Sequence, residues 1–104
     1  MNLLSPAKIN LFLQITGKRQ NGYHDLFTLM CCINLYDTVS LSFSAKHTTV
    51  SCNDPEVPED ESNLAVKAAN LFFKAIHKNE GVKIGLEKQI PVAAGLGGGS
   101  SNAA

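Results

Sequence analysis

The stretch PVAAGLGGGSSNAA, residues 91–104, decides how the fold of this chain is interpreted. It holds four glycines and two serines, but also the apolar residues Ala93 and Leu96. Because a Gly/Ser linker lacks apolar residues, an ordered loop explains the stretch better than a linker does. Residues 81–90 before it alternate apolar and polar side chains, which is typical of a strand. A glycine loop between a strand and a helix start presents free backbone N–H groups, and phosphate is the anion we expect there.

Three common phosphate-binding patterns do not fit these glycines. The Walker pattern needs a lysine after the last glycine, and none follows. Counted from Gly95 and Gly97, the third glycine of a dinucleotide-binding pattern would fall on Ser100. A protein-kinase glycine loop is a hairpin near the N-terminus rather than a turn from strand to helix near residue 100. The pattern that remains is P-x-x-x-G-L-G-x-x-S-S, from Pro91 to Ser101.

The residues before position 54 predict a mostly antiparallel sheet. Residues 6–16 alternate like a half-buried strand, which puts Lys8 and Asn10 on one face. Residues 17–25 contain the turn signal Asn-Gly and predict a long polar hairpin loop. Residues 26–35 are continuously apolar and favour a strand, although their periodicity also allows a short helix. Residues 37–44 alternate cleanly, and residues 48–53 are expected to pair beside them as a shorter strand.

One helix is expected after the acidic, proline-containing segment 54–62. Ser62 is the expected N-cap, and the acids at 59–61 would lie where the helix dipole favours negative charge. Gly81 is the expected end of this helix. Its apolar stripe is Ala65, Ala68, Ala69, Phe72 and Ile76.

Composition limits the class of protein. A chain of 104 residues with 44% hydrophobic content has the size of one globular domain. Nine basic and nine acidic side chains give zero net charge without any long block of like charge, so we expect no nucleic-acid partner and no membrane partner. Three cysteines, two of them adjacent, fit neither a disulfide framework nor a zinc half-site. Without an apolar targeting segment, we expect a cytoplasmic protein.

The glycine pattern and the opening SPAKINLFLQITGKRQNGYHDL, residues 5–26, together resemble the GHMP kinases. This resemblance implies an α+β fold in which a mostly antiparallel sheet packs with helices, as in the N-terminal domain of that family. Residues 1–104 would then be the ATP-binding N-terminal domain, incomplete at its C-terminus, and the C-terminal domain would be absent. A plant source would place the protein in a plastid instead of the bacterial cytoplasm.

The implied activity is an ATP-dependent phosphorylation with Mg²⁺. The substrate would be a small molecule, the cytidine diphosphate-linked methylerythritol of non-mevalonate isoprenoid biosynthesis, phosphorylated on its 2-hydroxyl. Two alternatives stay open: another GHMP kinase that acts on a different small alcohol, and a non-catalytic nucleotide-binding or interaction module.

The resemblance also implies roles for single residues. Lys8 matches the active-site lysine, Asn10 the substrate end, and Tyr23 with His24 the residues that hold the cytosine ring. Asn63 and Lys88 match positions that border the adenine. No side-chain metal site is implied. The ATP phosphate loop would consist of Pro91, Val92, Ala93, Ala94, Gly95, Leu96, Gly97, Gly98, Gly99, Ser100 and Ser101.

One catalytic element of the family is missing from these residues. In the family, the aspartate that accepts or orients the hydroxyl proton of the substrate belongs to a G-x-D-[VI]-P motif, and no aspartate of this chain lies in such a motif. We therefore expect residues 1–104 alone to be inactive. We also expect apolar surface around Ile9, Leu11, Val39 and Leu86 to be exposed. Gly98→Val should remove ATP binding and leave the fold largely intact.

Overall fold

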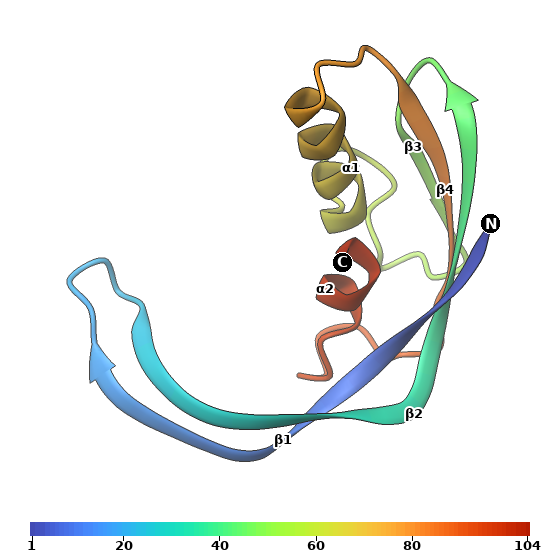
Figure 1. Cartoon of the computed structure of the whole chain (residues 1–104). Coiled ribbons are helices and arrows are strands. Elements are labelled where there is room, and N and C mark those ends of the chain that lie inside the picture. The colour runs from blue at the N-terminus through green and yellow to red at the C-terminus, as the bar shows by residue number, and fades with distance from the viewer.

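A four-stranded sheet with two helices on one of its faces makes up the fold (Figure 1). The computed structural model describes all 104 residues. The α+β architecture expected from the sequence is confirmed. No helix combines the length and the apolar character that crossing a membrane requires. In chain order the elements are β1 (Asn2–Lys18), β2 (His24–Ala45), β3 (Thr49–Cys52), α1 (Leu64–Ala75), β4 (Gly81–Glu87) and α2 (Gly98–Ala103).

The strand order is β1-β2-β4-β3. β2 pairs antiparallel with β1 on one side and with β4 on the other. The prediction that residues 48–53 pair beside residues 37–44 is wrong, because both edges of that part of β2 are already occupied. β3 instead pairs in parallel with β4, with Val50 opposite Ile84.

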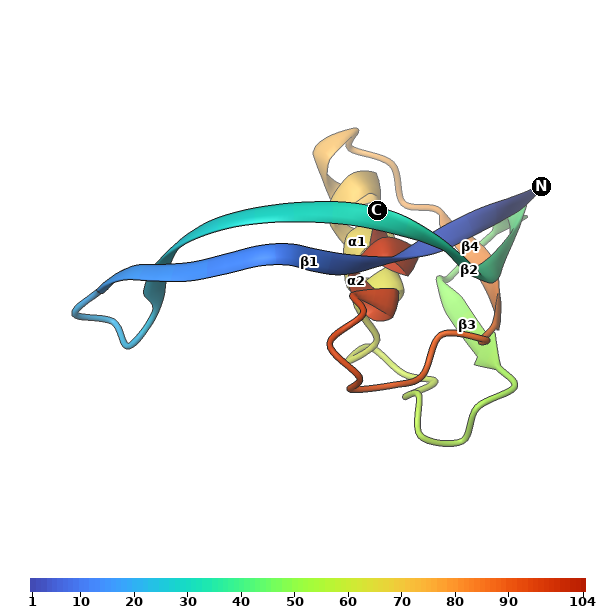
Figure 2. The ribbon, with the colours of Figure 1, turned by 90° about the horizontal axis from the view of Figure 1, so that it is seen from below.

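β1 and β2 form a long curved hairpin arm that extends away from the helices (Figures 1 and 2). The expected long loop is only residues 19–23, because the strands continue to Lys18 and from His24. The pairing shifts register at three places, between Pro6 and Lys8, between Asn10 and Phe12 and between Ile15 and Gly17. Such irregularities bend a ladder, which accounts for the curvature.

The core lies between α1 and the part of the sheet formed by β2, β3 and β4. Val39 and Leu86, which were expected to be exposed, are 6% and 5% exposed because α1 covers this part of the sheet. Ile9 and Leu11 lie on the arm and are exposed, as expected. The buried cluster is Val39, Val50, Ala65, Val66, Val82, Ile84 and Leu86.

The ends of α1 differ from the prediction. Asn63 rather than Ser62 is the N-cap, and its side-chain oxygen accepts a hydrogen bond from the backbone N–H of Ala65 at 2.9 Å. No acidic residue lies in the first turn. The helix ends at Ala75, and Gly81 is the first residue of β4. Gly81 is needed there because a Cβ atom would lie 2.2 Å from the backbone of His47.

Candidate functional site

The segment from Pro91 to Gly97 forms the loop that precedes α2. Ala93, Gly95 and Gly97 have φ values of 57°, 73° and 71°, in the left-handed region, and they alternate with residues outside it. Loops in which left-handed residues alternate with right-handed ones can turn successive N–H groups toward one side, an arrangement that binds anions. The glycines could be read from the sequence, but the left-handed Ala93 could not, since alanine rarely adopts that conformation.

A pocket of about 340 Å³ lies between this loop, the end of β4 and the start of α1. Of the residues expected at ATP, ten of the eleven loop positions line it, together with Asn63 and Lys88, and Ser101 is the exception. Residues 56–58 and 62–64 also line it. The fold thus brings the glycine loop and Asn63, about 30 residues apart in the chain, to one pocket.

Lys8 is held against the loop by both its backbone and its side chain. Its N–H donates to the carbonyl oxygen of Leu96 at 2.8 Å, and its ammonium donates to the carbonyl oxygen of Gly95 at 2.9 Å. A Cβ atom on Gly97 would lie 3.1 Å from the Lys8 side chain. The Gly97 position therefore lets the lysine pass close to the loop backbone.

A chain of hydrogen bonds continues from Lys8 along the arm. Its ammonium donates to Asn10 Oδ1 at 2.7 Å, and Asn10 Nδ2 donates to Thr28 Oγ1 at 2.8 Å. The Thr28 hydroxyl donates to the carbonyl oxygen of Phe12 at 2.7 Å. The expectation that Lys8 and Asn10 share a face is confirmed. Thr28 was not predicted, because its contribution depends on how β2 pairs with β1.

The two loop serines have different surroundings. Ser101 Oγ accepts a hydrogen bond from Ser5 Oγ at 2.8 Å, so this hydroxyl is tied to β1. Ser100 is exposed and lines the pocket. Ser100 is therefore the serine whose hydroxyl can turn toward a phosphate or a metal-bound phosphate.

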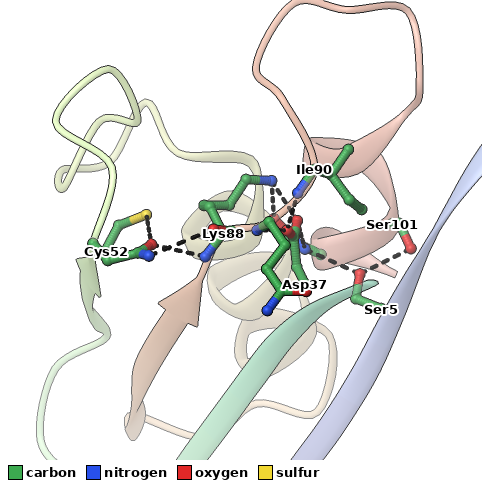
Figure 3. Close-up of polar contacts among 9 residues, drawn as sticks. Ser5, Asp37, Cys52, Lys88, Ile90 and Ser101 are labelled. Atoms are coloured by element: carbon green, nitrogen blue, oxygen red, sulfur yellow. Dashed lines mark hydrogen bonds and ion pairs between the residues drawn. The ribbon is translucent and has the colours of Figure 1, made fainter. Parts of the chain in front are cut away.

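Lys88 does not present its charge to the pocket that it lines. Its ammonium pairs with Asp37 Oδ2 at 2.5 Å and also donates to Asn102 Oδ1 at 3.0 Å (Figure 3). The Asp37 side chain is completely buried and that of Lys88 is 5% exposed. Burial raises the pKa of Asp37, but hydrogen bonds from the Ile90 N–H, Lys88, the Gln89 N–H and Asn102 together hold it below 3.8.

Gly98 is buried at the start of α2, which changes the expectation for its substitution. A Cβ atom there would lie 2.9 Å from Ile90 Cγ2 and 3.1 Å from Lys88 Nζ. The prediction that Gly98→Val leaves the fold largely intact is therefore wrong. Gly99 is exposed, and its nearest neighbour would be Leu64 Cδ1 at 3.6 Å. A substitution at Gly99 reaches the pocket without a collision in the core.

Tyr23 and His24 lie at the tip of the hairpin arm. Lys8 and Lys18, which pairs with His24, are separated by roughly 30 Å of strand. Tyr23 is 72% exposed, and the Arg19–Asp25 ion pair at 2.6 Å spans the adjoining turn. The structure thus groups Lys8 and Asn10 with the loop but leaves Tyr23 and His24 at the far end of the arm. The arm bends toward the side on which the loop lies (Figure 1).

Comparisons with known proteins agree with this geometry. Residues 63–104 match the sequence family described as GHMP kinases N terminal domain. A crystal structure of a 4-(cytidine 5'-diphospho)-2C-methyl-D-erythritol kinase superposes with a TM-score of 0.78 at 41% identity, covering 99% of this chain and 37% of that one. A crystal structure of a mevalonate kinase gives a TM-score of 0.68 at 19% identity and supports the fold alone.

The resemblance to the GHMP kinases indicated by the two motifs is confirmed, and the fold is that of their N-terminal domain. Among curated relatives, the chloroplastic 4-diphosphocytidyl-2-C-methyl-D-erythritol kinase of Oryza sativa subsp. japonica is 53% identical over all of this chain. The corresponding kinase of Clostridium botulinum (strain Eklund 17B / Type B) is 48% identical, again over the whole chain. The chain spans 26% and 37% of the lengths of these two relatives.

Proposed function

We propose that the chain is the ATP-binding part of a kinase that phosphorylates the 2-hydroxyl of 4-diphosphocytidyl-2-C-methyl-D-erythritol. The observation that carries this proposal is the contact of Lys8 with both Gly95 and Leu96. It joins the two motifs of the resemblance, which are some 87 residues apart in the chain. Identities of 48–53% to relatives that carry this name support the choice of substrate.

In this proposal the loop 91–101 binds the phosphates of ATP through its backbone. The left-handed conformations of Ala93, Gly95 and Gly97 support this role, because such residues can direct neighbouring N–H groups to one side of a loop. The first N–H groups of α2 have no partner within the helix and add donors. Asn63 lines the same pocket and would border the adenine. Lys88 contributes its aliphatic stem to the wall, since its ammonium is paired with Asp37.

The proposed role of Lys8 is electrostatic. Its ammonium, held between Asn10 and Gly95, can stabilise the negative charge that develops on the transferred phosphoryl group. When bound with ATP, Mg²⁺ neutralises charge on the phosphates. The structure has no cluster of three or more acidic, histidine or cysteine ligands for a metal. The hydroxyl of Ser100, which is exposed and lines the pocket, would be the protein group available to the ion.

The substrate would lie along the concave side of the arm. Asn10 is next to Lys8 and can hydrogen-bond the reacting end of the substrate. Tyr23 and His24 would hold the cytosine ring by stacking and by a hydrogen bond to its edge. Because these residues are at the far end of the arm, we infer that the arm tip and the loop approach each other when the substrate binds.

We also propose that residues 1–104 form the N-terminal domain of a longer enzyme and are inactive alone. Every aspartate of the chain is already engaged: Asp25 with Arg19, Asp37 with Lys88, and Asp54 and Asp60 with backbone N–H groups of their own turns. The exposed apolar residues of the arm support a covering segment from elsewhere in the protein. The names of the relatives support a bacterial cytoplasmic or plastid location.

Product analysis tests this function. The complete enzyme is incubated with ATP, Mg²⁺ and one of three alcohols: the diphosphocytidyl substrate, mevalonate or homoserine. Phosphorus NMR should show a new phosphomonoester on the 2-oxygen of the diphosphocytidyl substrate only. A phosphorylated product from mevalonate or homoserine alone would favour a different GHMP kinase. Nucleotide binding without any product would favour a non-catalytic module.

A further inference from the structure

We propose that Asp37 is a positioning residue that holds both ends of the phosphate loop in register, an inference that rests on the proposed function of that loop. Asp37 lies on β2, outside both motifs of the resemblance and outside the pocket. It is completely buried, and both of its carboxylate oxygens are used.

The first oxygen of Asp37 fixes the chain that enters the loop. Asp37 Oδ1 accepts hydrogen bonds from the backbone N–H groups of Gln89 at 2.7 Å and Ile90 at 2.9 Å. These two residues directly precede Pro91, where the loop begins. Ile90 is 1% exposed, so its side chain anchors the same point in the core.

The second oxygen fixes the chain that leaves the loop. Asp37 Oδ2 accepts from Asn102 Nδ2 at 3.0 Å, and Asn102 is in α2. The same oxygen pairs with the ammonium of Lys88, which also donates to Asn102 Oδ1 at 3.0 Å. One carboxylate therefore joins residues 88–90 on one side of the loop to Asn102 on the other. Figure 3 shows Asp37 between Lys88 and Ile90.

Ser5 extends this connection to β1. Asn102 Nδ2 also donates to Ser5 Oγ at 3.0 Å, and Ser5 Oγ donates to Ser101 Oγ at 2.8 Å. The amide of Asn102 thereby uses both its donors and its carbonyl oxygen. β1 also carries Lys8, so the network sets the position of the loop relative to that lysine. Buried networks in which every member is satisfied hold one geometry.

A negative charge is needed at position 37 for this geometry. In Asp37→Asn the amide oxygen can still accept from Gln89 and Ile90. The amide nitrogen would face the donors of Lys88 and Asn102, which leaves the buried ammonium unpaired. The entry to the loop then keeps its bonds to position 37, while Asn102 at the exit loses its bond to that position and keeps only those to Lys88 and Ser5. This difference between the two ends of the loop distinguishes a positioning role of Asp37 from a general contribution to folding.

The test compares Asp37→Asn with Glu80→Gln in the complete enzyme. Glu80 is an exposed carboxylate just before β4 and is the control for loss of one charge. We expect Asp37→Asn to raise the KM for ATP on the order of tenfold, the scale for losing hydrogen bonds to a charged group. The KM for the alcohol substrate should change by less than about threefold. An unchanged KM for ATP in the folded variant would overturn the proposal.

Hydrogen exchange supplies a readout that does not need catalysis. In Asp37→Asn without nucleotide, exchange should accelerate at the N–H groups of Lys8, Ser101 and Ala104, which bond the loop or α2. The N–H groups of the β2–β4 ladder should keep their wild-type rates. Equal acceleration in both sets would mean that Asp37 acts only on global stability, which also overturns the proposal.

A second variant covers the case in which Asp37→Asn does not fold. Asn102→Ala removes the exit contact but leaves the Asp37–Lys88 pair, so it should reproduce the faster exchange at Ser101 and Ala104 and the higher KM for ATP. Wild-type exchange rates in Asn102→Ala would contradict the positioning role. If the wild-type enzyme phosphorylates no alcohol, the proposed function fails, while the exchange data still decide the role of Asp37.

Discussion

The ammonium of Lys8 lies 2.9 Å from the carbonyl oxygen of Gly95, and the Lys8 N–H lies 2.8 Å from that of Leu96. A residue of the first strand is thus bonded to the loop at the other end of the chain. The contact places a positive charge beside the loop that we propose to bind phosphate. Removing the lysine should therefore affect both chemistry and loop position.

Lys8→Ala in the complete enzyme should lower kcat at least on the order of 10²-fold, the scale for losing one electrostatic stabiliser of the transition state. Its KM for ATP should rise only a few-fold, because the backbone bond to Leu96 remains. Steady-state kinetics measures both effects. Lys83→Ala, which removes an exposed lysine of β4, is the control and should match wild type. A kcat within threefold of wild type in Lys8→Ala would contradict the assigned role.

Gly99→Val should weaken ATP binding by at least about tenfold, because the branched side chain would enter the pocket beside the loop backbone. The thermal midpoint should stay near that of wild type, since Gly99 is exposed and faces no core atom within 3.4 Å. Calorimetric titration with ATP measures the affinity. Gly99→Ala should give a smaller loss. Equal ATP affinity in the valine variant and wild type would argue against phosphate binding at this loop.

Tyr23→Ala should raise the KM for the diphosphocytidyl substrate with little change in the KM for ATP, because the proposed stacking lies at the arm tip, away from the pocket. Loss of a stacking platform is worth roughly 1–3 kcal/mol, on the order of tenfold or more in KM. Tyr23→Phe keeps the ring and serves as the control. If the ring contributes nothing, the two variants will have the same substrate KM.

Asp37 predicts a specific dependence of stability on pH. Its pKa is below 3.8 in the folded protein, so its interactions stabilise the fold above pH 3.8 and this contribution is lost as the pH falls through the lower, folded pKa. Thermal midpoints of wild type and Asp37→Asn should differ most near neutral pH and converge in strong acid. A difference that stays constant from neutral to acid pH would mean that the charge of Asp37 has no part in stability.

The sequence was sufficient to predict elements whose signals are local. The strand alternation around Lys8 and Asn10 corresponds to β1. The helix expected to follow the glycine loop corresponds to α2, which already begins at Gly98. The wrong predictions concern partners: β3 was paired with the wrong strand, and α1 was given Ser62 as its cap instead of Asn63. The pairing of β3 depends on which strand edge is free in the folded sheet. The N-cap of α1 depends on which side-chain oxygen lies next to the first N–H groups of the helix.

In the candidate site, too, some residues could be predicted from the sequence and others could not. The glycine positions could be read from the pattern, and the pocket brings them together with Asn63. The contributions of Asp37 and Thr28 could not be read, because each arises from hydrogen bonds between segments far apart in the chain. The geometry of Lys88 likewise depends on Asp37, 51 residues away. A motif identifies residues near a ligand better than the residues that hold them in place.

The loop 91–101, held by Lys8, is the element that we propose binds the phosphates of ATP. The most direct test of this claim is a backbone amide NMR titration of the complete enzyme with a non-hydrolysable ATP analogue and Mg²⁺, with adenosine as the comparison. We predict that the analogue shifts the N–H signals of Gly97, Gly99, Ser100 and Lys8, and that adenosine shifts those near Asn63 but leaves the loop signals in place. Loop signals that do not move at saturating analogue, or that move equally with adenosine, would contradict the claim.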